Sequence, residues 1–354
     1  MDKVRFGVVG IGNMGSSHCK WLNDGKSVKN GVLTAACDIN PEKIENIKKQ
    51  LTDASAVTFF DDAEKMFGSG LIDVAIIAVP HYDHPGLVIK ALDAGLNVIC
   101  EKPAGVYTKQ VKEMNERAAK SDKIFALMFN QRTRPIFRKM REMVKEGAIG
   151  NIKRLNWIIT DWYRSQSYYD SGSWRATWAG EGGGVLFNQA PHNVDLFQWI
   201  PDMMPSKVRA FCHFGKWHDI EVEDDVTTYV EYPNGATGVF ITSTGDAPGT
   251  NRLEVTLDGG KLVCDGKKLW MYKLDEFVDD FSAHWKNGFG APGCTEIEVE
   301  TDGENPQHAG GLRQFAAHLL RGEPLTALGE EGINGLMISN AMHLSSWTGK
   351  TVTL

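Results

Sequence analysis

The sequence predicts an α/β fold in two parts: an N-terminal doubly wound parallel sheet and a C-terminal α/β domain with a large open, mainly antiparallel sheet. Residues 1–130 contain short, continuously apolar runs separated by helical segments, which is typical of parallel strands covered on both faces. Residues 131–354 contain runs in which apolar and polar residues alternate, as in strands with one exposed face. A length of 354 residues also favours two domains.

Each element follows from the local pattern. In the first part we expect strands at 4–9, 32–37, 57–60, 74–79, 97–100 and 124–129, and helices starting at 16–22 and covering 41–51, 63–67, 85–94 and 108–121. In the second part we expect a helix at 135–146 and strands at 152–160, 207–215, 226–232, 236–243, 252–257 and 261–264. Glycine turns such as 233–235 join the alternating strands.

Composition excludes several classes of protein. The net charge of −7 and the lack of a basic cluster argue against a nucleic-acid partner. There is no apolar run of 18 residues to span a membrane, and residues 1–3 lead into the first strand without a signal-peptide pattern. The six cysteines include no Cys-x-x-Cys pair, so we expect free thiols in a reducing cytoplasm and no metal site.

A glycine-rich turn follows the first strand, with Gly10, Gly12 and Gly15 in Gly-x-Gly-x-x-Gly spacing. Between a strand and a helix, these glycines permit a tight turn, a close backbone approach to pyrophosphate, and close packing of the helix on the strand. The N–H groups of a helix N-terminus also attract phosphate. The turn therefore predicts a dinucleotide site, in which Asn13 and Met14 are expected to contact the cofactor.

Asp38 ends the second predicted strand, where this kind of site needs a carboxylate for the adenosine ribose hydroxyls. A carboxylate repels the 2′-phosphate of NADP, and the nearest cation is Lys43 rather than an arginine. The sequence therefore favours NAD as the cofactor.

Lys102 stands at the carboxyl end of a predicted parallel strand, where open α/β sheets bind ligands. Strand alternation sends Lys102 and Glu101 to opposite sides. An ammonium group there holds a substrate oxygen and stabilises alkoxide charge, whereas the alternative is a solvated lysine. Pro80 and His84 follow the preceding strand, and we expect them and Glu101 on the cofactor side. A surface or capping role is the alternative for His84.

Another group of polar residues follows three glycines at 182–184. The sequence predicts a helix over 188–199 with Pro191 in its first turn, so that Asn188 and His192 share one face. The helix N-terminus favours neutral imidazole at His192, which is the form of a general base. The alternatives are a helix N-cap for Asn188 and a core position for His192.

These motifs resemble those of the glucose–fructose oxidoreductase/inositol dehydrogenase/MocA (Gfo/Idh/MocA) family over nearly the whole chain. The resemblance implies a Rossmann domain, a second domain whose open sheet forms subunit interfaces, and oxidation or reduction of a carbinol on a sugar, cyclitol or glycoside. It implies that Lys102 is the catalytic lysine and His192 the acid/base. The family's usual aspartate four residues before the histidine is Asn188 here, and an amide cannot exchange a proton at neutral pH.

Residues 157–178 contain seven aromatic side chains interleaved with charged groups, a pattern that suits pyranose rings. We expect Trp162, Tyr163, Trp174 and Arg175 to bind substrate, with core or interface packing as the alternative for about half of the rings. Other candidate substrate-binding residues are Asn130, Arg132 and His308, which follow the last parallel strand or open a late helix.

The combined expectation is a cytoplasmic NAD-dependent dehydrogenase that acts on a cyclic sugar, cyclitol or glycoside. By resemblance, it forms a dimer or tetramer through the open sheet. Two alternatives remain: an NAD-dependent glycosidase acting by oxidation and elimination, and a non-catalytic dinucleotide-binding sensor. The presence of both Lys102 and His192 argues against the sensor, because binding alone requires neither.

Overall fold

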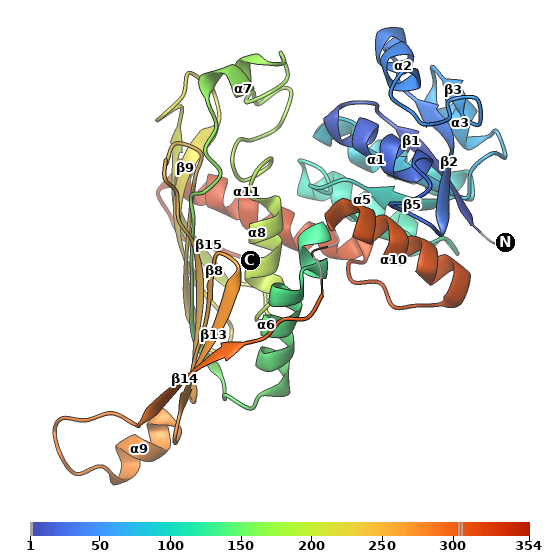
Figure 1. The fold of residues 1–354 in the computed structure, drawn as a ribbon. Coiled ribbons are helices and arrows are strands. Elements are labelled where there is room, and N and C mark those ends of the chain that lie inside the picture. The colour runs from blue at the N-terminus through green and yellow to red at the C-terminus, as the bar shows by residue number, and fades with distance from the viewer. Residues whose placement is uncertain (1–2, 304, 306) are drawn as a thin grey trace. The chain divides into compact units, whose positions relative to one another are not determined.

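The computed structural model describes residues 3–303, 305 and 307–354 (Figure 1). Their internal contacts define two compact units: residues 3–133 with 307–336, and residues 134–303 and 305 with 337–354. The sequence predicts a single boundary between residues 130 and 131. The return of residues 307–336 to the first unit is not evident from the sequence pattern.

Within the described residues of the first unit, six parallel strands form one sheet in the order β3-β2-β1-β4-β5-β6. The strands are β1 (Val4–Val9), β2 (Gly31–Cys37), β3 (Thr58–Phe60), β4 (Val74–Ile77), β5 (Asn97–Cys100) and β6 (Phe125–Leu127). The helices between them are α1 (Asn13–Asn23), α2 (Pro41–Lys48), α3 (Ala63–Phe67), α4 (His84–Asp93) and α5 (Thr108–Ala118). Strand order reverses between β1 and β4, and doubly wound sheets bind ligands at the carboxyl ends of the strands beside such a switch point.

The late helix α10 (Gln307–Arg321) completes the core of this first unit. Its Leu312 and Phe315 are buried in one cluster with Phe6 and Val8 of β1. Apolar side chains gain free energy by leaving water, so a helix with this face packs on the sheet that offers a matching apolar surface. Packing therefore explains why 307–336 belong to the first unit.

Within the described part of the second unit, nine strands form a sheet in the order β14-β13-β12-β11-β7-β10-β9-β8-β15. All neighbours are antiparallel except β10 and β7. The strands are β7 (Ile152–Ile159), β8 (Lys207–Phe214), β9 (Glu223–Glu231), β10 (Thr237–Ser243), β11 (Asn251–Leu257), β12 (Gly260–Asp265), β13 (Lys268–Leu274), β14 (Cys294–Val299) and β15 (Val352–Thr353). The accompanying helices are α6 (Pro135–Glu146), α7 (Gln166–Asp170), α8 (Pro191–Trp199), α9 (Val278–His284) and, from residue 337 onwards, α11 (Gly332–Thr348).

One face of this sheet is covered and the other is open. Helices α6 and α8 lie on the covered side (Figure 1), where Phe137 of α6 packs on Trp157 and Phe197 of α8 packs on Phe240. Ile158, which follows Trp157 in β7, lies on the opposite face and is 40% exposed. The predicted α/β fold, with a parallel sheet and a mainly antiparallel open sheet, is confirmed.

Some elements differ from the prediction. The helix expected over 188–199 begins only at Pro191, because the Asn188 N–H bonds to the Gly184 carbonyl in a separate turn. Strands β13 and β14, helix α9 between them, and helix α11 are present but are not among the elements expected from the sequence. No helix within the described ranges combines the length and apolar character needed to cross a membrane.

Candidate active site

The glycine turn after β1 has the geometry that its spacing predicts. Gly10 adopts a left-handed φ of 89°, and its N–H donates to the Cys37 carbonyl at 2.8 Å. A Cβ on Gly15 would lie 1.7 Å from the Gly10 carbonyl oxygen, so only glycine permits this approach of α1 to the turn. A Cβ on Gly12 would meet nothing within 4 Å, which leaves space beside the backbone for a phosphate group.

The N-terminus of α1 faces this turn. Gly12 is the N-cap residue, and no side chain caps the helix. Asn13 and Met14 are the first helical residues, and the N–H groups of a first turn have no partner within a helix. These N–H groups and the helix dipole suit a pyrophosphate. The turn and helix therefore fit the phosphates of a dinucleotide.

Asp38 lies next to the glycine turn at the end of β2 and is only 5% exposed. One carboxylate oxygen accepts the Ile11 N–H at 2.7 Å, and the other accepts the Asn40 N–H at 2.8 Å. Each oxygen keeps a further acceptor position for a ribose hydroxyl. The Lys43 ammonium, which is half-exposed, lies 3.5 Å from the carboxylate and is the cation that a 2′-phosphate would meet.

Two residues expected on the cofactor side have buried side chains that contact the protein. The ring nitrogens of His84 lie 2.7 Å from the Pro103 carbonyl and 2.9 Å from the Val79 carbonyl. Burial lowers the pKa of His84, which favours the neutral ring. His84 is therefore buried and does not lie at the surface. Its ring connects the segment after β4, which contains Val79 and Pro80, to the segment after β5, which contains Pro103.

Glu101 is 4% exposed and accepts a hydrogen bond from His18 Nε2 of α1 at 2.7 Å. Burial by itself would raise its pKa, but the bond from His18 and the positive charges of His18, His308 and Lys102 lower the pKa of Glu101 to about 2. The Glu101 side chain thus anchors β5 to α1 through Oε1, whereas its Oε2 is buried and has no hydrogen-bond partner among the described residues. The expected cofactor contact of Glu101 stays a prediction.

Lys102 immediately follows Glu101 and is partly exposed. It emerges next to β4, one strand from the switch point between β1 and β4, because β5 pairs with β4. The positive charge of its ammonium helps to lower the pKa of both Glu101 and His308. A cation at the carboxyl end of the sheet can bind an oxygen that becomes negatively charged during a reaction.

The three residues predicted near the last parallel strand divide into two groups. Asn130 Nδ2 lies 3.3 Å from His308 Nδ1, and burial lowers the pKa of His308. Arg132 is fully buried, donates to the Thr326 carbonyl at 3.2 Å, and forms an ion pair with Glu331. The Arg132 guanidinium therefore holds the chain after α10, which favours a structural role over the predicted substrate contact.

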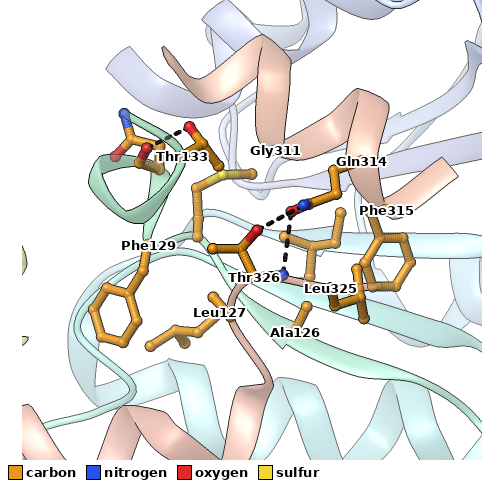
Figure 2. A pocket seen from close by; sticks show the side chains of 13 residues that line it. Ala126, Leu127, Phe129, Thr133, Gly311, Gln314, Phe315, Leu325 and Thr326 are labelled. Atoms are coloured by element: carbon orange, nitrogen blue, oxygen red, sulfur yellow. Dashed lines mark hydrogen bonds between the residues drawn. The ribbon is translucent and has the colours of Figure 1, made fainter. Parts of the chain in front are cut away.

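Figure 2 shows a small pocket beside these residues, between β6 and α10. Gln314 and Thr326 bond across it at 2.6 Å, and the apolar walls include Leu127 and Phe315. Its volume of about 30 Å³ accommodates water but no sugar ring. We therefore interpret it as a packing defect within the first unit and not as a substrate site.

In the second unit, Glu223 at the start of β9 holds the triple-glycine segment. Its Oε1 accepts the N–H groups of Gly184 and Leu186 at 2.9 and 3.0 Å, and its Oε2 lies 2.9 Å from His343 Nε2. A Cβ on Gly184 would lie 2.0 Å from the Glu223 carbonyl oxygen. The glycines therefore allow the chain to lie directly on β9.

His192 is the second residue of α8, with Pro191 in the first position as predicted, and it is 7% exposed. The N-cap residue is Ala190 and no side chain caps the helix, so the capping alternative for Asn188 is wrong. The predicted shared helix face is also wrong, because Asn188 precedes the helix. Its amide instead donates to the buried carboxylate of Glu181.

The aromatic block contains both core and accessible rings. Trp157 is fully buried and belongs to the core, whereas Tyr163 is 52% and Trp174 36% exposed. The Arg175 guanidinium stacks on Trp174 at 4.7 Å and on Tyr168 at 4.6 Å, and it donates to the Tyr168 hydroxyl at 2.8 Å. These residues form a polar aromatic surface of the kind that binds sugars.

Trp162 has a buried indole N–H that finds no hydrogen-bond partner among the described residues. A buried donor of this kind is costly unless a ligand or water accepts its hydrogen bond. This unpaired donor supports the prediction that Trp162 binds substrate.

Sequence reasoning missed several buried acidic residues in the second unit. Asp224 accepts the N–H groups of Lys216, Trp217 and His218, and so fixes the loop after β8. Glu181 and Glu223 act similarly on other loops. An acidic residue next to a run of glycines, or at the start of an apolar strand, was the available signal.

Comparisons with known proteins agree with this geometry. Residues 4–129 match the family described as oxidoreductase family, NAD-binding Rossmann fold, and residues 137–263 match the GFO/IDH/MocA C-terminal domain. Myo-inositol 2-dehydrogenase of Thermotoga maritima is 25% identical over 99% of this chain and 98% of its own length. Levoglucosan dehydrogenase of Pseudarthrobacter phenanthrenivorans is 24% identical over 71% of this chain and 70% of its own length.

Among solved structures, the WlbA dehydrogenase of Chromobacterium violaceum in complex with NADH and UDP-GlcNAcA has a TM-score of 0.83. It is 25% identical, and the match covers 100% of this chain and 96% of that one.

The glycine turn offers a matched pair of substitutions. Gly12→Ala has room for its methyl group, so its melting temperature should stay within about 2 °C of wild type while NAD binds about tenfold more weakly. Gly15→Ala forces a methyl group onto a carbonyl oxygen and should lower the melting temperature by about 5 °C or more. Thermal unfolding and NADH fluorescence titration measure both effects. Equal destabilisation by the two variants would contradict this assignment of the glycines.

Proposed function

Because the chain belongs to the Gfo/Idh/MocA family of NAD-binding oxidoreductases, we propose that it transfers hydride between nicotinamide and a secondary carbinol of a cyclic sugar, cyclitol or glycoside. The observation that carries this proposal is the position of Lys102 at the carboxyl end of β5, in the unit that holds the glycine turn and Asp38. The names of the relatives support the substrate class, since two of them are dehydrogenases of an inositol and an anhydrosugar.

The bound cofactor supplies the hydride acceptor. Lys102 is suited to hold the substrate oxygen: its ammonium donates hydrogen bonds and stabilises negative charge as the hydroxyl loses its proton. The C–H bond then breaks with its electron pair passing to the cofactor, and the carbinol becomes a carbonyl. The reverse reaction uses the same contact to polarise the carbonyl.

His192 is the proposed acceptor of the hydroxyl proton. Its place in the first turn of α8 sets it near the positive end of a helix, which favours the neutral imidazole that a base requires. Asn188 cannot exchange a proton, so it is assigned a hydrogen-bonding role only. In the reducing direction His192 returns the proton to the alkoxide.

For substrate recognition we propose Trp162, Tyr163, Trp174 and Arg175 of the second unit. In the first unit we propose Asn130 and His308. The stacked Arg175 and Trp174 offer an apolar face beside a charged donor. Sugar rings present C–H faces and hydroxyl edges, which such a surface satisfies together.

We also propose that a second copy of this chain covers the open sheet face. Ile158 and Tyr229 are 40% and 43% exposed there, and they line one shallow groove with Val239 and Ile241. Light scattering should give at least a dimer, and Tyr229→Glu should shift it towards monomer because the new charge would be buried. A monomeric wild-type protein would contradict this interface.

We place the reaction in a reducing compartment, as in the cytoplasm. All six cysteines are free thiols and five of them are buried. Burial raises the pKa of Cys19 to about 12, which keeps that thiol protonated and unreactive.

A panel of pyranoses, inositols and glycosides with NAD tests the function directly. We expect at least one polyol to produce NADH, followed by its absorbance. Lys102→Ala should lower kcat by about 100-fold or more while NAD affinity changes only slightly, since the ammonium contacts the reacting oxygen. His192→Ala should lower the rate by about 10²–10⁴-fold.

Each of these results has a contrary outcome. Equal loss of NAD binding in Lys102→Ala would make Lys102 a cofactor residue, and an unchanged pH profile with near-normal rate in His192→Ala would remove its acid/base role. Release of an aglycone without net NADH would favour the glycosidase alternative. NAD binding without turnover of any polyol in either direction would favour the sensor.

Cofactor preference follows from Asp38. When a phosphate lies about 4 Å from a carboxylate in an effective dielectric of about 20, each unit of its negative charge is repelled by several kcal/mol. Screening by salt and the positive charge of Lys43 both reduce this repulsion. We expect NAD to be preferred over NADP by at least about tenfold in kcat/KM. Asp38→Ser should reduce the preference for NAD over NADP. Adding Lys43→Ala to this variant should restore part of the preference, because it removes the cation that a 2′-phosphate would contact. Equal use of both cofactors by the wild-type enzyme would show that Asp38 does not contact the ribose.

A further inference from the structure

Glu181 is a buried carboxylate that joins two segments of the candidate substrate site. It lies directly before the triple glycine and is 1% exposed. Its Oε2 accepts the backbone N–H of Ala176 at 2.7 Å, and its Oε1 accepts a hydrogen bond from the amide Nδ2 of Asn188. One side chain therefore fixes both the Trp174–Arg175 segment and the segment that leads to His192.

The contact with Ala176 holds an unfavourable backbone conformation. Ala176 has a φ of 53°, in the left-handed region that residues with a Cβ rarely adopt. Such a residue persists only where its surroundings hold it. The bond from its N–H to Glu181 is one such restraint, and it acts on the backbone immediately after Arg175.

The contact with Asn188 determines how that amide is oriented. An ionised carboxylate only accepts hydrogen bonds, so Asn188 must turn its NH₂ group towards Glu181. The amide is planar, and its Oδ1 consequently points away from Glu181 as an acceptor of fixed direction. Asn188 is partly exposed, whereas its neighbour Gln189 is buried and lies 3.4 Å from the Tyr168 hydroxyl.

The pair also explains why an amide stands at this position. An aspartate at 188 would place a second carboxylate against Glu181 in a buried setting, where two like charges in contact are strongly unfavourable. An amide supplies a donor to Glu181 and still presents an oxygen on its other side. Glu181 and Asn188 are thus chemically matched to one another.

We propose that Glu181 is the positioning residue of the substrate site: it holds Asn188 so that the amide oxygen accepts a hydrogen bond from a substrate hydroxyl, and it holds Arg175 beside the same substrate. This inference rests on the proposed function. In this segment the carboxylate stands at Glu181, seven residues before Asn188, and position 188 carries a neutral amide. His192 remains the group of this segment that exchanges a proton.

A charge-swap cycle tests the pair. Asn188→Asp places a second carboxylate against Glu181. In Glu181→Gln the new NH₂ group must face another donor, either the Ala176 N–H or the Asn188 NH₂. Each single variant should lose about tenfold or more in kcat/KM and should melt at a lower temperature. In the double variant the new amide at 181 accepts from Ala176 and donates to the new carboxylate at 188, so the bonds to Ala176 and across the 181–188 pair are both restored. Its kcat/KM should return to within about threefold of wild type, and its melting temperature should recover.

Two further readouts separate positioning from simple structural support. All rates are measured well below the lowest melting temperature, and NADH affinity, which the first unit determines, should be unchanged throughout. The double variant should gain a titrating group in the acid limb of its pH profile, because its carboxylate now contacts the substrate and the wild-type amide does not titrate. Asn287→Asp adds one carboxylate at an exposed position of the same unit and should match wild type in every measurement.

The proposal is overturned if the single variants keep kcat/KM within about twofold while only their melting temperatures fall, which is the result for a purely structural residue. It is equally overturned if the double variant is no better than the worse single variant in rate and stability. Failure of the wild-type protein to oxidise any polyol overturns the proposed function instead. The pair is then judged by the thermal cycle, in which a double variant no more stable than Asn188→Asp would refute it.

Discussion

The close approach of α1 to the turn after β1 is the contact on which the first unit depends. Gly15 makes it possible, because any side chain there would collide with the Gly10 carbonyl. Once α1 is held in this position, its N-terminus faces the turn and its next turn carries His18 to Glu101 at the end of β5. One packing contact therefore places both the phosphate-binding N–H groups and the partner that anchors the strand of Lys102.

Buried carboxylates organise the segments that have neither helical nor strand hydrogen bonding. Asp38 accepts two backbone N–H groups, Glu223 accepts two, and Asp224 accepts three. A carboxylate has about four acceptor positions, so one such side chain replaces several missing backbone partners. The chain pays for each buried charge in desolvation, and the ordered backbone N–H groups offset that cost. This arrangement gives irregular loops the fixed geometry that a binding site requires.

Sequence patterns predicted the parts of the structure that local chemistry decides. The apolar run of β4, the glycine turn, and the position of Lys102 after β5 all follow from neighbours within a few residues. The start of α8 did not, because the Asn188 N–H is satisfied by Gly184 and the helical pattern looks continuous across both turns. Helix α10 has a visible apolar face, but periodicity does not say which of two sheets will cover that face. That choice is made by packing between segments far apart in the sequence.

The same limit applies to polar residues that sequence position alone assigns to a ligand. Glu101 and Arg132 are charged and follow parallel strands, which is where ligand-binding residues occur. In the structure their charged groups also contact His18 and Glu331 inside the protein, so each of them supports the fold as well. Strand alternation turns Glu101 inward and leaves the next residue, Lys102, accessible. Residue type and position therefore identify the region of a site, whereas the partner of each charge decides whether that residue supports the site or acts in it.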